Sequence, residues 1–159
     1  MPRPPVVLVA GLRTPWCRAG GAFAREDAGH LGALVARELL ARTGVDAAAI
    51  DEVIAGCVGP PHDQANVARV IGLRAGLPRQ VPARTVARNC ASGMEAVTTA
   101  MTAIESGRAS LVLCVGVEVM SRYPLIMNER STGLFDRLSR ARSPLARVAR
   151  SSSSGAPST

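Results

Sequence analysis

RTVARNCASGMEAVTTAMTAI, residues 84–104, joins a short run rich in β-branched residues to a longer run with helical periodicity. The first part predicts a strand over 84–89. The second predicts a helix over 92–107, because its larger apolar residues recur every three or four positions: Met94, Val97, Met101 and Ile104. This helix carries few charges and has alanines along another side, so we expect it to be enclosed between layers. The segment therefore predicts a strand, a turn containing Cys90, and a buried helix.

The rest of the chain repeats this alternation. Apolar runs predict further strands at 6–11, 52–59 and 111–120, and amphipathic patterns predict helices at 30–43 and 64–78, the first with Asp27 as its N-cap. Three of the apolar runs are almost continuously apolar, which is typical of strands buried on both faces. The order of elements predicts an α/β fold, with a mostly parallel mixed sheet and helices on both faces.

The composition fits one aliphatic domain and argues against nucleic-acid binding. Of 159 residues, 47% are hydrophobic but only 3% are aromatic. The net charge of +7 comes from arginine alone, since the chain has no lysine. Much of the excess lies after residue 129, where Phe135 is the only aromatic residue among the arginines, too few to form a base-stacking surface. We therefore expect no nucleic-acid partner.

The cysteines and the N-terminal apolar run indicate a reduced compartment. Cys17, Cys57, Cys90 and Cys114 form no CxxC pair, and a metal site built on Cys57 and His62 would have too few ligands. The apolar run at the N-terminus is too short to span a membrane. We expect a cytoplasmic protein with free thiols, no metal and no membrane span. Cys57 and Cys114 are expected in the core, and Cys17 in a glycine-rich loop.

Cys90 is the candidate nucleophile because of its place before the helix. The first N–H groups of a helix lack intrahelical partners and favour a negative charge, here a thiolate. The backbone of Ala91, Ser92 and Gly93 would support the oxyanion of a carbonyl under attack. The alternative from the residues alone is that Cys90 is a small buried apolar side chain, as free cysteines often are.

The segment RNCASGMEAV, 88–97, resembles the active-site segment of the thiolase family of acyl-CoA C-acyltransferases, with matches at Asn89, Cys90, Ser92 and Gly93. Further matching stretches cover about 6–148 in the family's order: VAGLRTP, DEVIAGCV, NVAR and AIESGRASLVLCVGVEVMSRYP. The resemblance implies that Cys90 forms an acyl thioester. The implied reaction is thiolytic cleavage of 3-ketoacyl-CoA, or the reverse Claisen condensation, in fatty-acid β-oxidation. Coenzyme A and acyl-CoA would be substrates, with no other cofactor.

The resemblance also implies groups that this sequence does not match. The family uses a histidine in a Gly-His-Pro motif and a second cysteine in a glycine-rich motif, both in a second half of similar fold. His30 and His62 have no such surroundings. Two expectations stay open: an acyltransferase whose catalytic partners lie elsewhere, or a truncated, non-catalytic thiolase fragment that acts as an assembly or binding module.

The domain boundaries and partners follow from the same resemblance. Residues 1–128 are expected to be a thiolase N-terminal domain, 129–148 the partly helical start of the family's loop region, and 149–159 a disordered tail. We expect a homodimer or pairing with a thiolase C-terminal half, because the apolar sides of the 92–107 helix need a covering surface.

Overall fold

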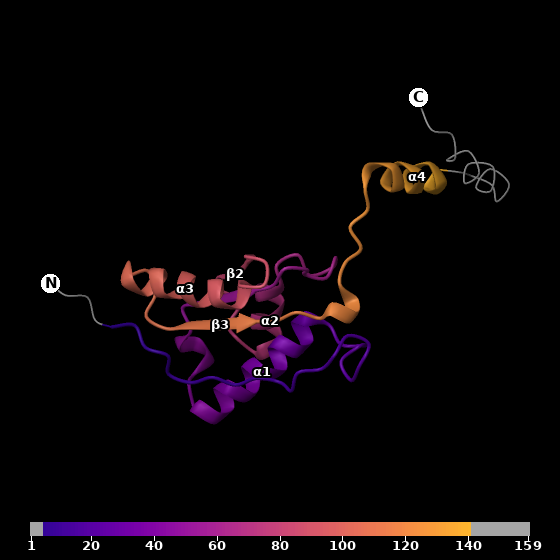
Figure 1. Cartoon of the computed structure of the whole chain (residues 1–159). Coiled ribbons are helices and arrows are strands. Elements are labelled where there is room, and N and C mark those ends of the chain that lie inside the picture. The colour runs from indigo at the N-terminus through magenta and orange to yellow at the C-terminus, as the bar shows by residue number, and fades with distance from the viewer. Residues whose placement is uncertain (1–4, 141–159) are drawn as a thin grey trace. The chain divides into compact units, whose positions relative to one another are not determined.

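The computed structural model describes residues 5–140, and the predicted 149–159 tail lies outside them. The described part divides at Pro124 into two compact units. The first unit carries the sheet and three helices (Figure 1). The second begins at Leu125 and contains α4, Glu129–Ser139, which starts after the N-cap Asn128.

Helices and strands alternate through the first unit. In chain order they are α1 Ala28–Thr43, β1 Glu52–Gly56, α2 Val67–Ala75, β2 Ala83–Val86, α3 Ser92–Glu105 and β3 Val112–Gly116, with short 3-10 turns at Ala47–Ala49 and Met120–Arg122. The Asp27 side chain caps α1, as predicted, by accepting a hydrogen bond from His30 N. Left-handed Gly44 and Gly76 end α1 and α2.

The sheet is parallel and has the order β2-β1-β3. The chain passes from β1 through α2 to the adjacent β2, then through α3 across β1 to β3. Helices α1 and α2 pack on one face of the sheet and α3 on the other (Figure 1). The predicted α/β fold is therefore confirmed.

Alternation along the central strand divides the core in two. Val53 and Ala55 point toward α1 and α2, into a large cluster that includes Val67 and Ile71. Ile54 points the other way and meets the alanines Ala96 and Ala100 of α3 in a small cluster. Both faces of β1 are thus buried, which explains its continuous apolar sequence.

The predicted strand at 6–11 is wrong. This segment forms no strand, and Val7, Leu8 and Val9 expose 67%, 83% and 72% of their surface. Within residues 5–140 it pairs with neither edge of the sheet, β2 or β3. An apolar run becomes a buried strand only where it pairs with a neighbouring strand and is covered by another layer, and this segment does neither in the described structure.

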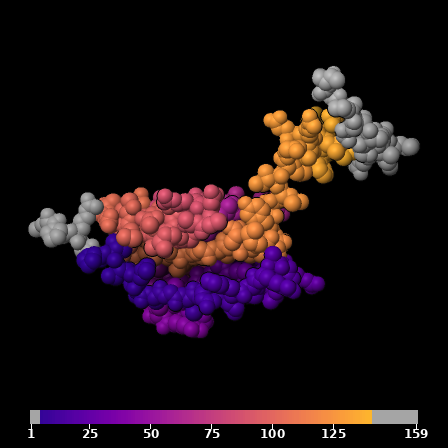
Figure 2. All heavy atoms as spheres, in the orientation of Figure 1, coloured from indigo at the N-terminus to yellow at the C-terminus, as the bar shows by residue number. Residues whose placement is uncertain are grey.

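The helix at 92–107 is covered on one side only in the described structure, so the predicted enclosure between layers is not seen there, while its exposed side agrees with the expected need for a covering surface. Helix α3 buries Ser92, Ala96, Ala100 and Ala103 against the sheet. The side with Met94 and Met101 faces outward, with Met94 65% exposed. Atoms of α3, in salmon, lie at the molecular surface in Figure 2. The small residues lie inside because they allow the helix to approach the sheet closely.

Candidate active site

Cys90 lies on an exposed turn between β2 and α3. Asn89, immediately before it, has a φ of +49° and is the one non-glycine residue with positive φ in the described chain. Asparagine tolerates this left-handed region better than most residues, yet the conformation must be held by its surroundings. The predicted strand, turn and helix around Cys90 are present, and Cys90 is not a buried apolar side chain.

Four hydrogen bonds close the turn over residues 88–92. Ala91 N donates to Arg88 O at 3.0 Å, and Ser92 N donates to Asn89 O at 3.1 Å. The Ser92 hydroxyl accepts from Arg88 N at 2.8 Å and donates to Asn89 O at 2.7 Å. Ser92 is 5% exposed, so this closure is internal to the fold. Cys90 therefore occupies the tip of a turn whose backbone is fixed on both sides.

Two glycines allow the backbone of the first turn of α3 to lie directly against the sheet. A Cβ atom on Gly56, the last residue of β1, would overlap the carbonyl oxygen of Ser92 and lie 2.7 Å from Gly93 N. A Cβ on Gly116, at the end of β3, would lie 3.2 Å from Gly93 Cα. Only hydrogen fits at Gly56, so backbone meets backbone here. The turn with Cys90 is thus fixed beside the carboxyl ends of the strands.

This end of the sheet is where α/β folds bind ligands. The chain leaves β1 toward α2 on one face, and leaves the neighbouring β2 toward α3 on the other. Cys57 N, just past β1, donates to Val86 O at the end of β2 at 3.1 Å. Adjacent parallel strands whose connections diverge create a crevice at their carboxyl ends. Cys90 follows β2 at this switch point.

The predicted oxyanion donors are not equivalent. The N–H groups of Ala91 and Ser92 already donate to carbonyls of the turn. No side chain caps α3, and within the described chain Gly93 N and Met94 N have no hydrogen-bond acceptor. The donors left over for a ligand thus belong to Gly93 and Met94 rather than to Ala91 and Ser92.

The other three cysteines are free thiols in different surroundings. Cys57 is buried as predicted, and burial together with the nearby Glu118 carboxylate raises its pKa to about 11. Cys114 packs against the small cluster under α3, and burial raises its pKa as well. Cys17 is exposed. The buried Cys57 and the half-buried Cys114 therefore stay protonated at neutral pH, which suits packing rather than nucleophilic chemistry.

Glu118 organises the loop that follows β1, a role that the sequence analysis missed. Its carboxylate accepts hydrogen bonds from Val58 N at 2.8 Å and Gly59 N at 3.2 Å. The Cys57 thiol lies 3.8 Å from the same carboxylate. An acidic residue directly after an apolar strand was the available signal, because carboxylates often bind the free N–H groups of a neighbouring turn.

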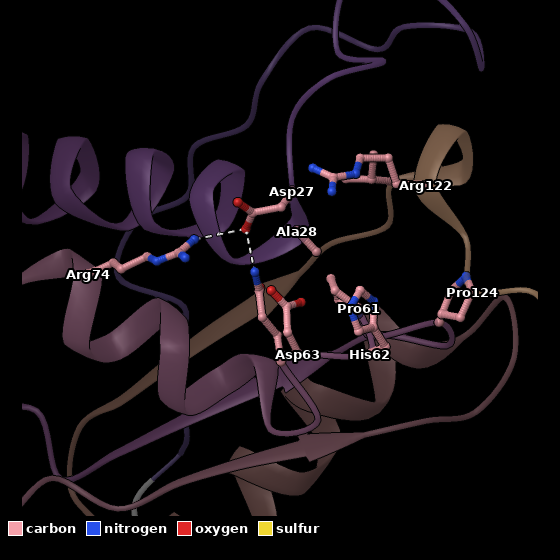
Figure 3. A pocket seen from close by; sticks show the side chains of 11 residues that line it. Asp27, Ala28, Pro61, His62, Asp63, Arg74, Arg122 and Pro124 are labelled. Atoms are coloured by element: carbon pink, nitrogen blue, oxygen red, sulfur yellow. Dashed lines mark hydrogen bonds and ion pairs between the residues drawn. The ribbon is translucent and has the colours of Figure 1, made fainter. Parts of the chain in front are cut away.

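A cavity of about 120 Å³ lies on the other side of the sheet, between the start of α1 and the loops after β1 and β3 (Figure 3). Its walls include Asp27, His62, Arg74 and Arg122, and do not include Cys90. Pockets for ligands of drug size enclose roughly 300–1,000 Å³. This cavity is therefore too small to hold an acyl-CoA.

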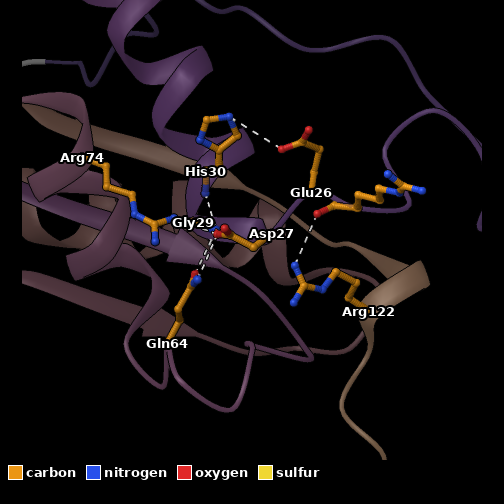
Figure 4. Close-up of polar contacts among 8 residues, drawn as sticks. Glu26, Asp27, Gly29, His30, Gln64, Arg74 and Arg122 are labelled. Carbon is orange, nitrogen blue, oxygen red and sulfur yellow. Dashed lines mark hydrogen bonds and ion pairs between the residues drawn. The ribbon is translucent and has the colours of Figure 1, made fainter.

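Asp27 is the centre of the polar groups beside this cavity (Figure 4). Its Oδ1 accepts from His30 N at 2.8 Å, Gln64 Nε2 at 2.9 Å and Arg74 at 2.8 Å. Burial opposes ionisation, but the hydrogen bonds from Gln64, His30 N and Arg74 outweigh it and lower the pKa of Asp27. Gln64 is buried and also accepts from Gly29 N at 3.1 Å. These contacts cap α1 and tie it to α2.

Neither histidine is joined to Cys90 by a hydrogen bond within residues 5–140. His30 lies in the first turn of α1, 3.6 Å from Glu26, and His62 lines the cavity. In the same range, no group of three or more His, Cys, Asp or Glu side chains is placed to hold a metal ion. The described residues thus supply an exposed thiol and backbone donors, without a histidine base.

Comparison with known proteins decides the family. A family model described as the thiolase N-terminal domain matches residues 6–153. The chain belongs to the thiolase family. The predicted resemblance, N-terminal portion included, is confirmed.

Relatives of this thiolase-family chain are much longer. A β-ketoadipyl-CoA thiolase from Escherichia coli is 44% identical over 129 residues, which cover 80% of this chain and 32% of the relative. A probable acetyl-CoA acetyltransferase from Escherichia coli K12 is 43% identical over 128 residues, 80% of this chain and 33% of the relative. The chain thus spans about a third of these curated relatives.

A solved structure supports the same fold. The acetyl-CoA acetyltransferase from Bacillus anthracis aligns with a TM-score of 0.66 and 37% identity, over 69% of this chain and 28% of that one. Among residues 5–140 of the thiolase-family chain, no helix has the length and apolar character needed to cross a membrane.

Proposed function

We propose that this chain carries the acyl-accepting part of a thiolase, an acyl-CoA C-acyltransferase. The observation that carries the proposal is Cys90, exposed at the tip of a hydrogen-bonded turn at the carboxyl end of the parallel sheet. The names of the relatives support the substrate class, since they include a thiolase and a probable acetyl-CoA acetyltransferase. We place the activity in the cytoplasm and in fatty-acid β-oxidation.

The proposed reaction balances without a cofactor beyond coenzyme A. The Cys90 thiolate attacks the ketone carbon of a 3-ketoacyl-CoA, and the bond between that carbon and C2 breaks. The electron pair leaves with acetyl-CoA, whose carbon takes up a proton, and the acyl group stays on sulfur as a thioester. The thiol sulfur of a second coenzyme A then attacks this thioester, and the bond between the acyl carbon and the Cys90 sulfur breaks. The shortened acyl-CoA is released, and the proton of the coenzyme A thiol passes to the departing Cys90 sulfur. The covalent intermediate divides one difficult step into two easier ones.

Two features of the turn fit the attack on a carbonyl. Carbonyl oxygen becomes an oxyanion as sulfur adds, and a preorganised N–H donor lowers the energy of that state. Of the predicted Ala91–Gly93 donors we assign the support to Gly93 N, because the N–H groups of Ala91 and Ser92 already donate within the turn. The closed turn would hold the thiol still while the carbonyl approaches.

The proton transfers require groups from another surface. The described residues bring no histidine to Cys90, so we propose that a thiolase C-terminal half, or a second copy of the chain, covers this side. The outward-facing Met94 and Met101 of α3 and the exposed 7–9 segment support a covering partner, because exposed apolar surfaces of this kind mark interaction sites.

A non-catalytic module is the second candidate function. The observation in its favour is the same lack of a histidine hydrogen-bonded to Cys90 within the described residues. In that case the chain would bind a thiolase partner through α3 and transfer no acyl group. The two functions differ in whether Cys90 becomes acylated.

Acyl transfer can be tested on the chain itself. Incubation with acetyl-CoA at neutral pH, followed by intact-mass and peptide analysis, should place one acetyl group on Cys90. Cys90→Ser should abolish this adduct, and the matched variant Cys17→Ser should keep it, since Cys17 is equally a free exposed cysteine. An unmodified chain, or an adduct lost in Cys17→Ser instead, would favour the non-catalytic module.

A further inference from the structure

The Ser92 hydroxyl has an unusual use for a serine at the start of a helix. Serine near a helix N-terminus usually binds the free amides of the first turn. Here it faces backward, accepting from Arg88 N and donating to Asn89 O, and α3 has no side-chain cap. The hydroxyl therefore serves the turn that carries Cys90 and leaves the first amides of the helix unoccupied.

We propose that Ser92 is a positioning residue for Cys90, which holds Asn89 in its left-handed conformation and so fixes the direction of the thiol. The proposal rests on the acyl transfer proposed above. It differs from the role expected for Ser92 from the sequence, which was backbone support of the oxyanion. The side chain acts on the residues before the cysteine, through two short hydrogen bonds of 2.8 and 2.7 Å.

The left-handed conformation of Asn89 needs such a restraint. A non-glycine residue in this region is held in a conformation of higher energy, which persists only where the surroundings impose it. Arg88 N and Asn89 O lie on either side of the Asn89 Cα atom, so one hydroxyl bonded to both fixes the backbone that flanks it. Released from the hydroxyl, Asn89 would relax toward negative φ and carry the adjoining Cys90 with it.

Ser92 can impose this conformation because it is itself anchored. Its carbonyl oxygen lies against Gly56, where a Cβ atom would overlap it, and its side chain is buried. Two backbone hydrogen bonds also cross the turn, from Ala91 N and Ser92 N. The other side-chain link across it is the Arg88–Glu95 ion pair, at 2.7 Å, and its Arg88 side chain is largely exposed. Exposed ion pairs contribute little to stability, so the buried hydroxyl is the stronger of the two side-chain restraints.

The test uses the full chain and four versions of it: wild type, Ser92→Ala, the double variant Asn89→Gly/Ser92→Ala, and Ser106→Ala as a control. Ser106 is matched because its hydroxyl donates to Ala103 O, at the other end of the same helix. Two quantities are measured on each. One is the hydrogen-exchange rate of the backbone amides at positions 91 and 92; the other is the rate of Cys90 acetylation by acetyl-CoA, relative to its alkylation by iodoacetamide.

Ser92→Ala should speed exchange of the two turn amides by at least about tenfold relative to amides in the middle of α3. It should slow acetylation of Cys90 at least about tenfold, because misplacing the thiol by about 1 Å reduces the rate by that much or more. Alkylation needs only an accessible thiol, so its rate should change by less than about threefold. Glycine adopts positive φ without strain, so adding Asn89→Gly should bring the exchange rate of the turn amides and the acetylation rate of Cys90 most of the way back to wild type. Ser106→Ala should match wild type.

The outcomes distinguish the positioning role of Ser92 from the proposed acyl transfer to Cys90. Unchanged exchange of the turn amides in Ser92→Ala, or wild-type acetylation despite faster exchange, would overturn the positioning role. Failure of Asn89→Gly to restore either quantity would also overturn it, because a purely structural role of Ser92 would give that result. If wild type is never acetylated but exchange responds as expected, the acyl transfer is refuted and the restraint on Asn89 stands.

Discussion

Gly56 and Ser92 meet backbone to backbone, so closely that a Cβ atom on Gly56 would overlap the Ser92 carbonyl oxygen. Ser92 in turn closes the turn of Cys90. Through this one contact, the last residue of the central strand sets where the thiol lies.

Gly56→Ala should therefore be strongly destabilising. The backbone of α3 must shift, and such overpacking costs about 1–3 kcal/mol of unfolding free energy. Urea unfolding followed by circular dichroism measures the loss. Gly11→Ala, with open space around it and an ordinary φ, is the control and should change stability little. Equal stability of the two variants would show that the close contact is not real.

Glu118→Gln tests the loop that follows β1. The carboxylate accepts from Val58 N and Gly59 N, and loss of its charge should weaken both bonds. Because Glu118 is exposed, we expect a loss of only about 1 kcal/mol in unfolding free energy. Glu105→Gln, exposed at the end of α3, is the matched control. A loss of the same size in both variants would remove the assigned role of Glu118.

Asp27 should make stability depend on acid pH. Its pKa is lowered in the folded chain, so its contribution is fully present above the unfolded value near 3.8 and is lost as pH falls through the folded value. Urea midpoints should therefore fall between about pH 4 and pH 2, and less steeply in Asp27→Asn. Arg74→Met, which removes one of the three donors, should reduce the effect partly, while Arg79→Met at an exposed position should not. A steeper fall in Asp27→Asn would contradict the assigned direction.

Cys57 should make stability depend on alkaline pH in the opposite sense. Its pKa rises from 9.0 to about 11 on folding, so its contribution is complete below pH 9 and is lost between about pH 9 and 11. The chain has no lysine. The half-buried Cys114, whose pKa is also raised by burial, contributes a pH dependence of the same sign. Cys57→Ala should flatten the pH dependence there, measured by thermal unfolding, although it lowers stability overall. An identical slope in wild type and variant would refute the burial-driven shift.

The methionines of α3 should promote self-association of the isolated chain. Met94→Gln combined with Met101→Gln should shift sedimentation toward the monomer while changing unfolding free energy by no more than about 0.5 kcal/mol, as is usual for surface substitutions. Leu73→Gln, a comparably exposed apolar residue on α2, is the control and should leave sedimentation unchanged. An equal shift in the control would point to general hydrophobicity rather than this helix face.

The strand–turn–helix around Cys90 was predictable because periodicity changes there from strand to helix within a few residues. The N-cap at Asp27 was also visible in the sequence, whereas α2 ends at Gly76, before the predicted end at 78. The 6–11 segment could not be judged, because apolar content does not reveal whether a neighbouring strand exists to pair with it.

The contacts that shape the site were harder to foresee. Helix α3 has an alanine side and a methionine side, and the sequence does not say which meets the sheet; the glycines at 56 and 116 decide it by admitting only a close backbone approach. The backward-facing Ser92 hydroxyl and the Glu118 carboxylate depend on tertiary geometry that local patterns do not contain.

The alanines beneath α3 have a consequence for engineering. Ala96 and Ala100 act as spacers, and their small volume sets the height of the helix above Ile54. A larger side chain at either position would move α3 away from the sheet, together with the turn before it that carries Cys90. Substitutions between α3 and the sheet can therefore change the reactivity of the Cys90 thiol without altering the residues next to it in the turn.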